Sequence, residues 1–287
     1  MTDTPATLVI GATGTTGSRT AARLAAAGHR VRAASRRARP VPHAQPVRFD
    51  WYDPSTHAAA LDGVDRLYLV PPPGETDPAA VMLPFLRRAR AAGVGRAVLL
   101  SSSALPEGGP GAGRVHSALP DLFDAWAVLR PSWFMQNFTG SHAHAASIRE
   151  HGTLWTAAGD GRVGFVDADD IAAVAVRALT DDRAPDTDLV LTGPEALSYD
   201  DVAAIMTETT GRPVVHTRVS PESMRERLAA EIPPEFAALL AGMDLAIAAG
   251  AEDRTTDTVL RLTGRPPTDL RTVAAREAGT GAAVAAS

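Results

Sequence analysis

Three glycines near the N-terminus have the spacing of a phosphate-binding turn, G-x-x-G-x-x-G. Gly11, Gly14 and Gly17 follow the apolar run Leu8-Val9-Ile10 and precede residues 18–25, whose apolar side chains recur with helical periodicity. Glycine permits a tight turn and a close approach of ligand to backbone, and the free amides of a helix N-terminus hold a pyrophosphate. A purely structural turn would use glycines too, but the strand–turn–helix context favours a dinucleotide site. Thr13, Thr15 and Thr16, which lie among the glycines, are predicted to share it.

The next predicted strand, residues 29–35, ends where a dinucleotide site selects its coenzyme. NAD-binding proteins place an Asp or Glu there, about 20 residues beyond the glycines, on the ribose 2′-hydroxyl. This chain has Ser35-Arg36-Arg37 instead, with no acid nearby. A solvated basic turn is the alternative interpretation, but guanidinium groups suit a phosphate dianion. We therefore predict a 2′-phosphate clamp and the coenzyme NADP(H).

Other candidate cofactor contacts lie where further strands end. The predicted strand 46–51 ends with Asp50, placed to accept a hydrogen bond from an adenine amine, and Trp51; a strand-end acid and a core tryptophan are an equal alternative. A strand over 65–70 stops at prolines, which cannot continue a ladder, so the chain leaves the sheet where a cofactor would lie. The remaining predicted contacts, at the ends of this strand and of the strands 96–100 and 127–131, are Val70, Pro71, Pro72, Ser101 and Pro131.

An aromatic segment, residues 132–138, follows the strand 127–131. Ligands of open α/β sheets bind beyond the carboxyl ends of the strands, so this segment is a natural pocket wall. We predict Trp133, Phe134 and Asn137 to contact the substrate, although a buried aromatic cluster would have the same composition.

The residues available for proton transfer narrow the chemistry. The chain has no lysine, since all 28 basic side chains are arginine, so the Tyr-x-x-x-Lys pair of classical short-chain dehydrogenases is excluded. Ser102 has the position of their catalytic serine, but none of Tyr52, Tyr68 and Tyr199 follows it at helical spacing. Reduction of a ketone requires a proton donor for the alkoxide, whereas an iminium ion becomes neutral on accepting hydride and a quinone accepts hydride readily. The missing acid therefore favours pre-activated acceptors.

His116 is the one candidate proton donor, because it follows the glycine-rich loop 106–113 and its ordinary pKa range suits the task. The alternative for His116 is an exposed helix histidine. The sequence offers no clear metal site: Asp167, Asp169 and Asp170 are interpreted as helix-capping acids, and His142 and His144 as surface residues without a third ligand.

Strands and helices alternate with short links over the first half of the chain, which predicts an α/β, Rossmann-like, doubly wound parallel sheet. We expect residues 1–155 to form this domain, with a helix over 168–180 and a strand over 188–193 also packed on it. Residues 156–287 would form a smaller, mostly helical substrate region with a disordered tail from about Gly279.

Composition limits the partners. A net charge of −5, no cysteine, and no apolar run near the roughly 20 residues of a membrane span favour a cytoplasmic protein that binds neither nucleic acid nor membrane. The sequence leaves open whether the protein is a monomer or a homodimer.

With these segments identified, the chain resembles the NmrA-like group of atypical short-chain dehydrogenases/reductases, and within it the ergot alkaloid biosynthesis reductases. The resemblance implies a Rossmann domain that binds NAD(P)H, a small C-terminal domain, and a substrate in the cleft between them. The group includes quinone reductases, iminium reductases and redox-sensing proteins. The matching segments are residues 11–17, 69–73, 129–138, 164–172, 191–200 and 262–267.

Together these observations predict an NADPH-dependent reductase of an iminium ion, a quinone or an enone, acting in secondary metabolism. Two alternatives remain: a dinucleotide-sensing regulator of the NmrA type without turnover, and an isomerase or cyclase on the same fold.

Overall fold

The computed structural model describes residues 5–230, 232 and 234–285. The chain forms two compact units, each built from two stretches of sequence. Unit 1 comprises Met1–Pro131 and Ala168–Val190, and unit 2 comprises Ser132–Asp167 and Leu191–Ser287.

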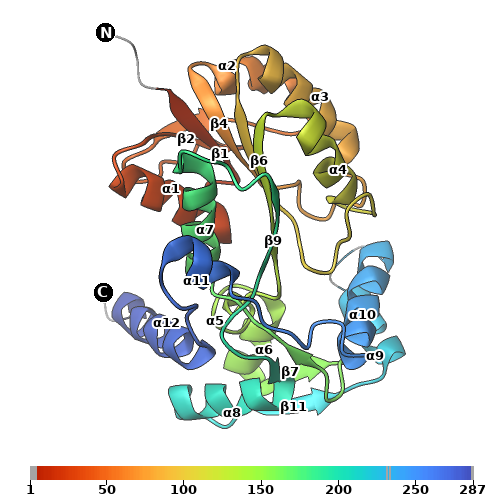
Figure 1. Ribbon diagram of the computed structural model, residues 1–287. Coiled ribbons are helices and arrows are strands. Elements are labelled where there is room, and N and C mark those ends of the chain that lie inside the picture. Colours follow the sequence, from red (N-terminus) through yellow and green to blue (C-terminus); the bar gives the residue numbers. More distant parts are fainter. Residues whose placement is uncertain (1–4, 231, 233, 286–287) are drawn as a thin grey trace. The chain divides into compact units, whose positions relative to one another are not determined.

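Unit 1 is built on a seven-stranded sheet of order β3-β2-β1-β4-β5-β6-β9 (Figure 1). The pairings from β3 through to β6 are all parallel, and β9 lies at the edge beside β6. The chain leaves β1 on one side for β2 and β3 and returns on its other side with β4, so the strand order reverses at β1. The predicted α/β Rossmann-like fold is thereby confirmed. The strands are β1 (Ala6–Ile10), β2 (Arg30–Ser35), β3 (Gln45–Arg48), β4 (Val64–Leu69), β5 (Arg96–Leu100), β6 (Ala125–Pro131) and β9 (Thr187–Leu191).

Helices cover this sheet, with α1 packed against α7 and α3 against α4. All five residues of β1 are buried, as expected for a central strand of a parallel sheet. The largest side chains of the core include Phe85, Leu67 and Leu99, which are almost or fully buried. The helices are α1 (Thr15–Ala26), α2 (His57–Leu61, after a 3₁₀ turn Pro54–Thr56), α3 (Ala79–Ala91), α4 (Gly113–Leu122) and α7 (Ala168–Thr180).

Unit 2 is mostly helical, with two small sheets in which β7 pairs parallel with β11 and β8 antiparallel with β10. Its core gathers Phe138, Phe165 and Tyr199 with aliphatic residues of α8, α10 and α12. A capping box formed by Ser198 and Asp201 starts α8. The elements are α5 (Gln136–Thr139), α6 (Ala143–His151), β7 (Thr153–Thr156), β8 (Arg162–Val163), β10 (Leu197–Ser198), α8 (Tyr199–Thr210), β11 (Val215–Arg218), α9 (Pro221–Ala229), α10 (Pro234–Ala248), α11 (Thr258–Thr263) and α12 (Leu270–Ala285).

Two expectations about the limits of the units differ from the structure. The first stretch of unit 1 ends at Pro131 rather than near residue 155. The reason is that the segment after β6 packs into the core of unit 2 through Met135 and Phe138. The tail expected to be disordered from Gly279 is helical to Ala285, and residues 286–287 lie outside the described part of the chain. Alanine has the highest helix propensity, and three alanines in residues 279–285 offset the two glycines there.

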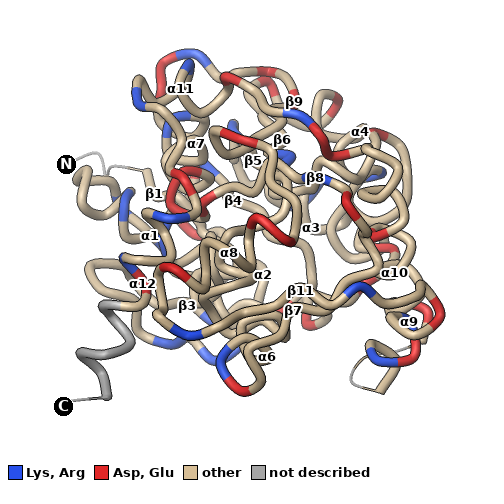
Figure 2. Tube along the Cα trace, turned by 90° about the horizontal axis from the view of Figure 1, so that it is seen from below, with Lys and Arg blue, Asp and Glu red and all other residues tan. Residues whose placement is uncertain are grey.

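Charges of both signs are interspersed along the chain (Figure 2). None of the helices that the structure describes is long and apolar enough to cross a membrane.

Candidate functional site

The turn after β1 forms a cradle of backbone in unit 1. Gly11 has a φ of +74°, and a Cβ on Gly17 would lie only 2.1 Å from the carbonyl oxygen of Gly11, so both positions require glycine. The Gly14 amide donates to the same oxygen at 2.8 Å. Gly14 is also the N-cap of α1, which has no side-chain cap and no acid in its first turn. The first amides of α1 therefore have no partner within the helix and form its positive end.

This cradle fits the phosphate groups of a dinucleotide, since a ligand can approach where side chains are missing. The structure also brings other predicted residues to it. Val70 packs against Gly11, and the Ala12 amide donates to Ala34 at the end of β2, directly before Ser35. Thr13 and Thr15 are exposed, whereas Thr16 is buried.

The turn after β2 presents arginines. The Ser35 carbonyl accepts from the amides of Ala38 and Phe49, and its hydroxyl accepts from the amide of Arg39 at 3.1 Å. The tight turn leaves Arg36, Arg37 and Arg39 exposed, and the described part of the structure holds no ion pair for any of the three. Arg39 was missed from the sequence analysis, although the pattern Arg-Arg-x-Arg was visible. Three unpaired guanidinium groups in one turn form a positive site for an anion.

Asp50 and Trp51, which lie shortly after the end of β3, differ in their surroundings. Trp51 is 8% exposed, packs edge-on against Phe49 and Phe85, and donates its indole N–H to the Val70 carbonyl at 3.1 Å. Its ring therefore belongs to the core, which was the alternative to a cofactor contact in the sequence analysis. One carboxylate oxygen of Asp50 accepts from the Tyr52 amide at 3.0 Å, and its contact with adenine stays a prediction.

The serines after β5 lie in a turn that Arg130 holds. The Arg130 guanidinium donates to the Ser103 carbonyl at 3.1 Å and to the Asp188 carboxylate at 2.7 Å. The Ser103 amide donates to the carbonyl of Pro131, at the end of β6. The Ser102 hydroxyl accepts from the Ala104 amide at 3.3 Å, which leaves its own proton available. The buried Ser101 hydroxyl has no hydrogen-bond partner among the described residues.

His116 is buried in α4, with 3% exposure, so the interpretation as an exposed helix histidine is wrong. Burial lowers its pKa, and its Nδ1 has no hydrogen-bond partner in the described part of the chain. The imidazole is therefore neutral at pH 7. Its role in proton transfer stays a prediction.

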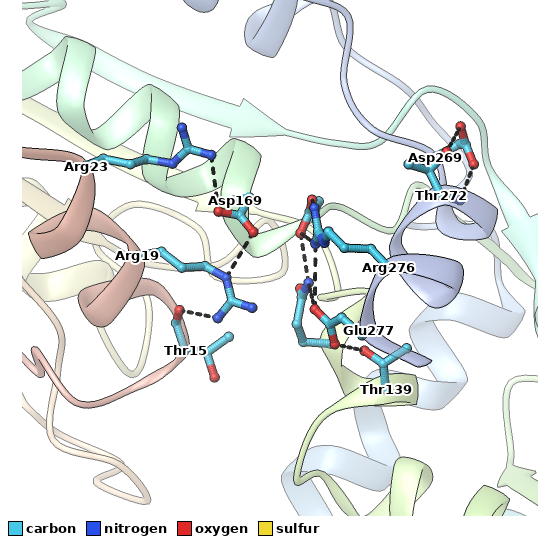
Figure 3. A network of polar contacts seen from close by, with 11 residues as sticks. Thr15, Arg19, Arg23, Thr139, Asp169, Asp269, Thr272, Arg276 and Glu277 are labelled. Carbon is cyan, nitrogen blue, oxygen red and sulfur yellow. Dashed lines mark hydrogen bonds and ion pairs between the residues drawn. The ribbon is translucent and has the colours of Figure 1, made fainter. Parts of the chain in front are cut away.

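The aspartates around the start of α7 bind arginines (Figure 3). In unit 1, Asp169 accepts from Arg19 at 3.2 Å and from Arg23 at 3.1 Å, which ties α7 to α1. In unit 2, the fully buried Asp167 accepts from Gln136 at 2.7 Å and from Arg276 at 3.1 Å. Asp167 and Asp169 thus take arginine partners. The described residues include no group of three or more His, Asp or Glu that could hold a metal ion.

Unit 2 contains a cavity of about 780 Å³. Trp133 and Asn137, two of the predicted substrate contacts, line it together with Trp155, Arg227 and residues of α6, α9 and α10. Phe134 is not among its described lining residues; its backbone instead bridges to Val166.

His142 and His144 line the same cavity, although the sequence analysis assigns them to the surface. His142 is exposed as expected and caps α6, because its Nδ1 accepts the His144 amide at 3.2 Å. His144 is only half-buried by surface area, but its ring lies within 6.3 Å of Phe138 and Tyr199. Burial lowers the pKa of both imidazoles, that of His144 to about 3, so neither is charged at pH 7.

Two further lining residues were missed from the sequence. Tyr199, the first residue of α8, has a ring only 1% exposed and packed against Phe165. Asp244, on α10, is 9% exposed, and its Oδ2 accepts from the Ala157 amide at 2.8 Å. Burial raises the pKa of both groups, and the Asp244 carboxylate raises that of Tyr199 further. One signal was available: Asp244 is a lone acid within the apolar stretch 236–249.

Comparison with known proteins places the chain in a family. A model of an NAD(P)H-binding family matches residues 11–182, and a model of the NmrA-like family matches residues 123–260. The uncharacterized oxidoreductase YesF of Bacillus subtilis is 46% identical over 272 residues, or 94% of each chain. The chain belongs to the NmrA-like NAD(P)H-binding oxidoreductases. Festuclavine synthase II of Penicillium roqueforti is 36% identical over 94% of this chain and 97% of its own.

The predicted resemblance to NmrA-like proteins close to the ergot alkaloid reductases is therefore confirmed, as is the prediction of an oxidoreductase. This NmrA-like protein uses a nicotinamide cofactor and a small-molecule substrate. The NADPH-dependent quinone oxidoreductase QOR2 of Escherichia coli, solved with NADPH, has a TM-score of 0.78 over 94% of this chain and 99% of its own. At 23% identity that likeness shows a shared fold.

Proposed function

We propose that this NmrA-like protein is an NADPH-dependent reductase that transfers hydride to a pre-activated small molecule of secondary metabolism, an iminium ion, a quinone or an enone. The observation that carries the coenzyme preference is the turn after β2, where Arg36, Arg37 and Arg39 are exposed without ion pairs among the described residues. No carboxylate is available in this turn to accept a ribose 2′-hydroxyl, whereas three guanidinium groups can hold a 2′-phosphate.

The residues of the chain have distinct tasks in this reaction. The amides at Gly14 and at the start of α1 hold the pyrophosphate, and Asp50, Pro71, Pro72, Ser101 and Pro131 stay predicted contacts along the carboxyl ends of the strands. A bound NADPH supplies the hydride. Trp133 and Asn137 contact the acceptor. Ser102 keeps a proton that it can donate, and His116 is a neutral imidazole; both stay predicted participants in proton transfer.

The acceptor class follows from the acids that are present. Ser102 is a weak acid, and burial raises the pKa of Tyr199 well above its usual range, which makes the tyrosine a poor proton donor at pH 7. Acceptors that need little or no protonation fit such a set of residues best. The name of festuclavine synthase II places one relative of this chain in alkaloid chemistry, which supports a nitrogen-containing acceptor.

The first experiment measures NADPH oxidation by absorbance with a panel of quinones, enones and cyclic iminium ions. Consumption of NADPH with at least one class is expected, and none with any class would refute the reductase. The coenzyme preference has a separate test in Arg36→Ala. Loss of one charged hydrogen-bonding pair, about 2 kcal/mol, predicts a roughly 30-fold weaker Kd for NADPH.

The same variant should bind NADH with a Kd within about twofold of the wild type, because NADH has no 2′-phosphate. Arg87→Ala, which removes an exposed arginine from α3, is the matched control and should change neither Kd. Equal losses for NADH and NADPH in Arg36→Ala would show that Arg36 is not a phosphate clamp.

A further inference from the structure

The cavity of unit 2 holds one deeply buried carboxylate, that of Asp244. The side chain is 9% exposed, and its Oδ2 is held by the Ala157 amide at 2.8 Å. Its Oδ1 has no hydrogen-bond partner among the described residues, although the residue lines the cavity. A buried carboxylate with a free oxygen is costly to keep ionised unless a cation or a second donor joins it.

Among the residues that the structure describes, no cation of unit 2 forms an ion pair with this carboxylate. Arg227 also lines the cavity, but it is exposed, and its guanidinium lies over the ring of Trp155, 4.0 Å from the centroid. No ion pair joins Arg227 to Asp244 in the described structure. His216 lies against the Tyr199 ring and is engaged by Asp200 and by Thr156, each at 2.8 Å. Its attraction lowers the pKa of Asp244, but burial outweighs that attraction and raises the pKa overall.

The other titratable groups that line the cavity do not compensate the negative charge of Asp244. His142 and His144 are neutral at pH 7. His151 and Glu150 line the cavity as well, but both side chains are 68% exposed and are screened by water. Asp244 is therefore the buried charge that a ligand in this cavity would meet.

Aromatic rings line the same cavity as Asp244. Trp133, Trp155 and Tyr199 contribute to the wall, and aromatic faces attract cations, as the position of Arg227 over Trp155 illustrates in this cavity. A neutral ligand would bury against the rings but leave the carboxylate oxygen unpaired. A ligand that combines a flat apolar ring with a positive charge would satisfy both.

We propose that Asp244 is a specificity-determining residue that supplies the counter-charge for a cationic, ring-containing ligand in this cavity. Under the proposed function, on which this inference rests, Asp244 selects iminium-type acceptors over quinones. Asp244 attracts the ligand through its negative charge and takes no part in proton transfer.

Binding without NADPH tests the inference apart from turnover, since no reduction can take place. The ligands are N-methylquinolinium, a cation, and 1-methylnaphthalene, a neutral ring system of the same shape. Quenching of the tryptophan fluorescence or calorimetry gives the two Kd values. The wild type is expected to bind the cation at least about tenfold more tightly.

Asp244→Asn should reduce this preference to less than about threefold and leave the Kd of 1-methylnaphthalene within about twofold. The amide oxygen of the asparagine can still accept from Ala157, so the fold is retained, which thermal unfolding checks. Glu150→Gln, at an exposed carboxylate on the same cavity, should keep the full preference.

A wild type that binds both ligands equally, or an Asp244→Asn variant that keeps the full preference, would overturn the inference. The first of these outcomes needs no variant and so does not depend on how Asp244→Asn folds. Failure of every acceptor to oxidise NADPH would refute the proposed reductase without changing the binding result, so the two failures are distinguishable.

Discussion

The backbone cradle after β1 makes a quantitative prediction for Gly17→Ala. A Cβ at residue 17 would lie 2.1 Å from the Gly11 oxygen and 2.6 Å from its carbon, whereas real Cβ atoms essentially never come closer than 3.0 Å. The turn or α1 must therefore move by about 1 Å. Both contacts are with backbone, so no side-chain rotation relieves them.

The displacement affects stability and cofactor binding by different amounts. Overpacking of this kind costs about 1–3 kcal/mol, from which the better helix propensity of alanine recovers about 1 kcal/mol. The free energy of unfolding should therefore fall by at most about 2 kcal/mol. The amides at the start of α1 shift with the helix, and weakening two hydrogen bonds to a charged phosphate by about 1.5 kcal/mol each predicts a Kd for NADPH about 100-fold higher.

Calorimetry gives the Kd, and urea denaturation of the free protein gives the free energy of unfolding. Gly28→Ala is the matched control. Gly28 lies just after the other end of α1, at a φ of +82° and with no atom within 4 Å of an added Cβ. Backbone strain should lower its unfolding free energy by about 1 kcal/mol, while the Kd for NADPH stays within about twofold.

This pair of variants separates a weakened protein from a damaged site. If Gly17→Ala binds NADPH within about threefold of the wild type, the turn is not the phosphate cradle. If Gly28→Ala loses as much affinity as Gly17→Ala, the loss reflects stability alone.

Three further predictions concern single charges. Arg39→Ala should weaken NADPH about fivefold in calorimetry and leave NADH unchanged, because it removes one of three cations facing a 2′-phosphate. Burial alone would raise the pKa of Asp169, but Arg19 and Arg23 outweigh burial and lower the pKa overall. Asp169→Asn should therefore lower the free energy of unfolding, measured in urea at pH 7, by about 1 kcal/mol. This loss should disappear as the pH falls through the folded-state pKa of Asp169, which lies below about 4. Burial raises the pKa of Asp244, so the ionised carboxylate lowers the stability of the folded protein at every pH above the pKa that Asp244 has in the unfolded chain. Asp244→Asn should therefore have a higher melting temperature than the wild type at pH 8. This difference should vanish below about pH 4, where the carboxyl group is protonated in both states.

The parts of the molecule that local sequence determines were predicted well. The strand before Gly11, the turn and the helix after it occupy consecutive residues, so periodicity and glycine spacing suffice to place them. The strand predicted over 188–193 corresponds to β9, which lies at the edge of the sheet of unit 1.

The parts that tertiary packing determines were not predicted. His116 is buried in α4, where its ring lies near that of Trp126 on β6, a contact between two elements that helical periodicity alone does not reveal. A core position was one of the two interpretations of Trp51, and its packing against Phe85, far away in the sequence, decides between them. The boundary of unit 1 was placed too late because nothing local marks Pro131 as the end of a unit. Its spacing from Ser102 excludes Tyr199 as the catalytic tyrosine of a short-chain dehydrogenase. That criterion says nothing about the wall of a cavity, which residues from several elements form.

The difference between the two sites follows from the same argument. The cofactor cradle draws on backbone within a few residues of Gly14, whereas the cavity wall draws on residues from Trp133 to Asp244. Its chemistry depends on what the fold brings together, a carboxylate and aromatic rings. On the proposal that Asp244 holds a cationic acceptor, hydride transfer converts that cation into a neutral amine. In water near neutral pH an aliphatic amine takes up a proton, so the product can still pair with the carboxylate as an ammonium ion. Asp244 therefore acts on the choice of acceptor, before hydride transfer, and transfers no proton itself.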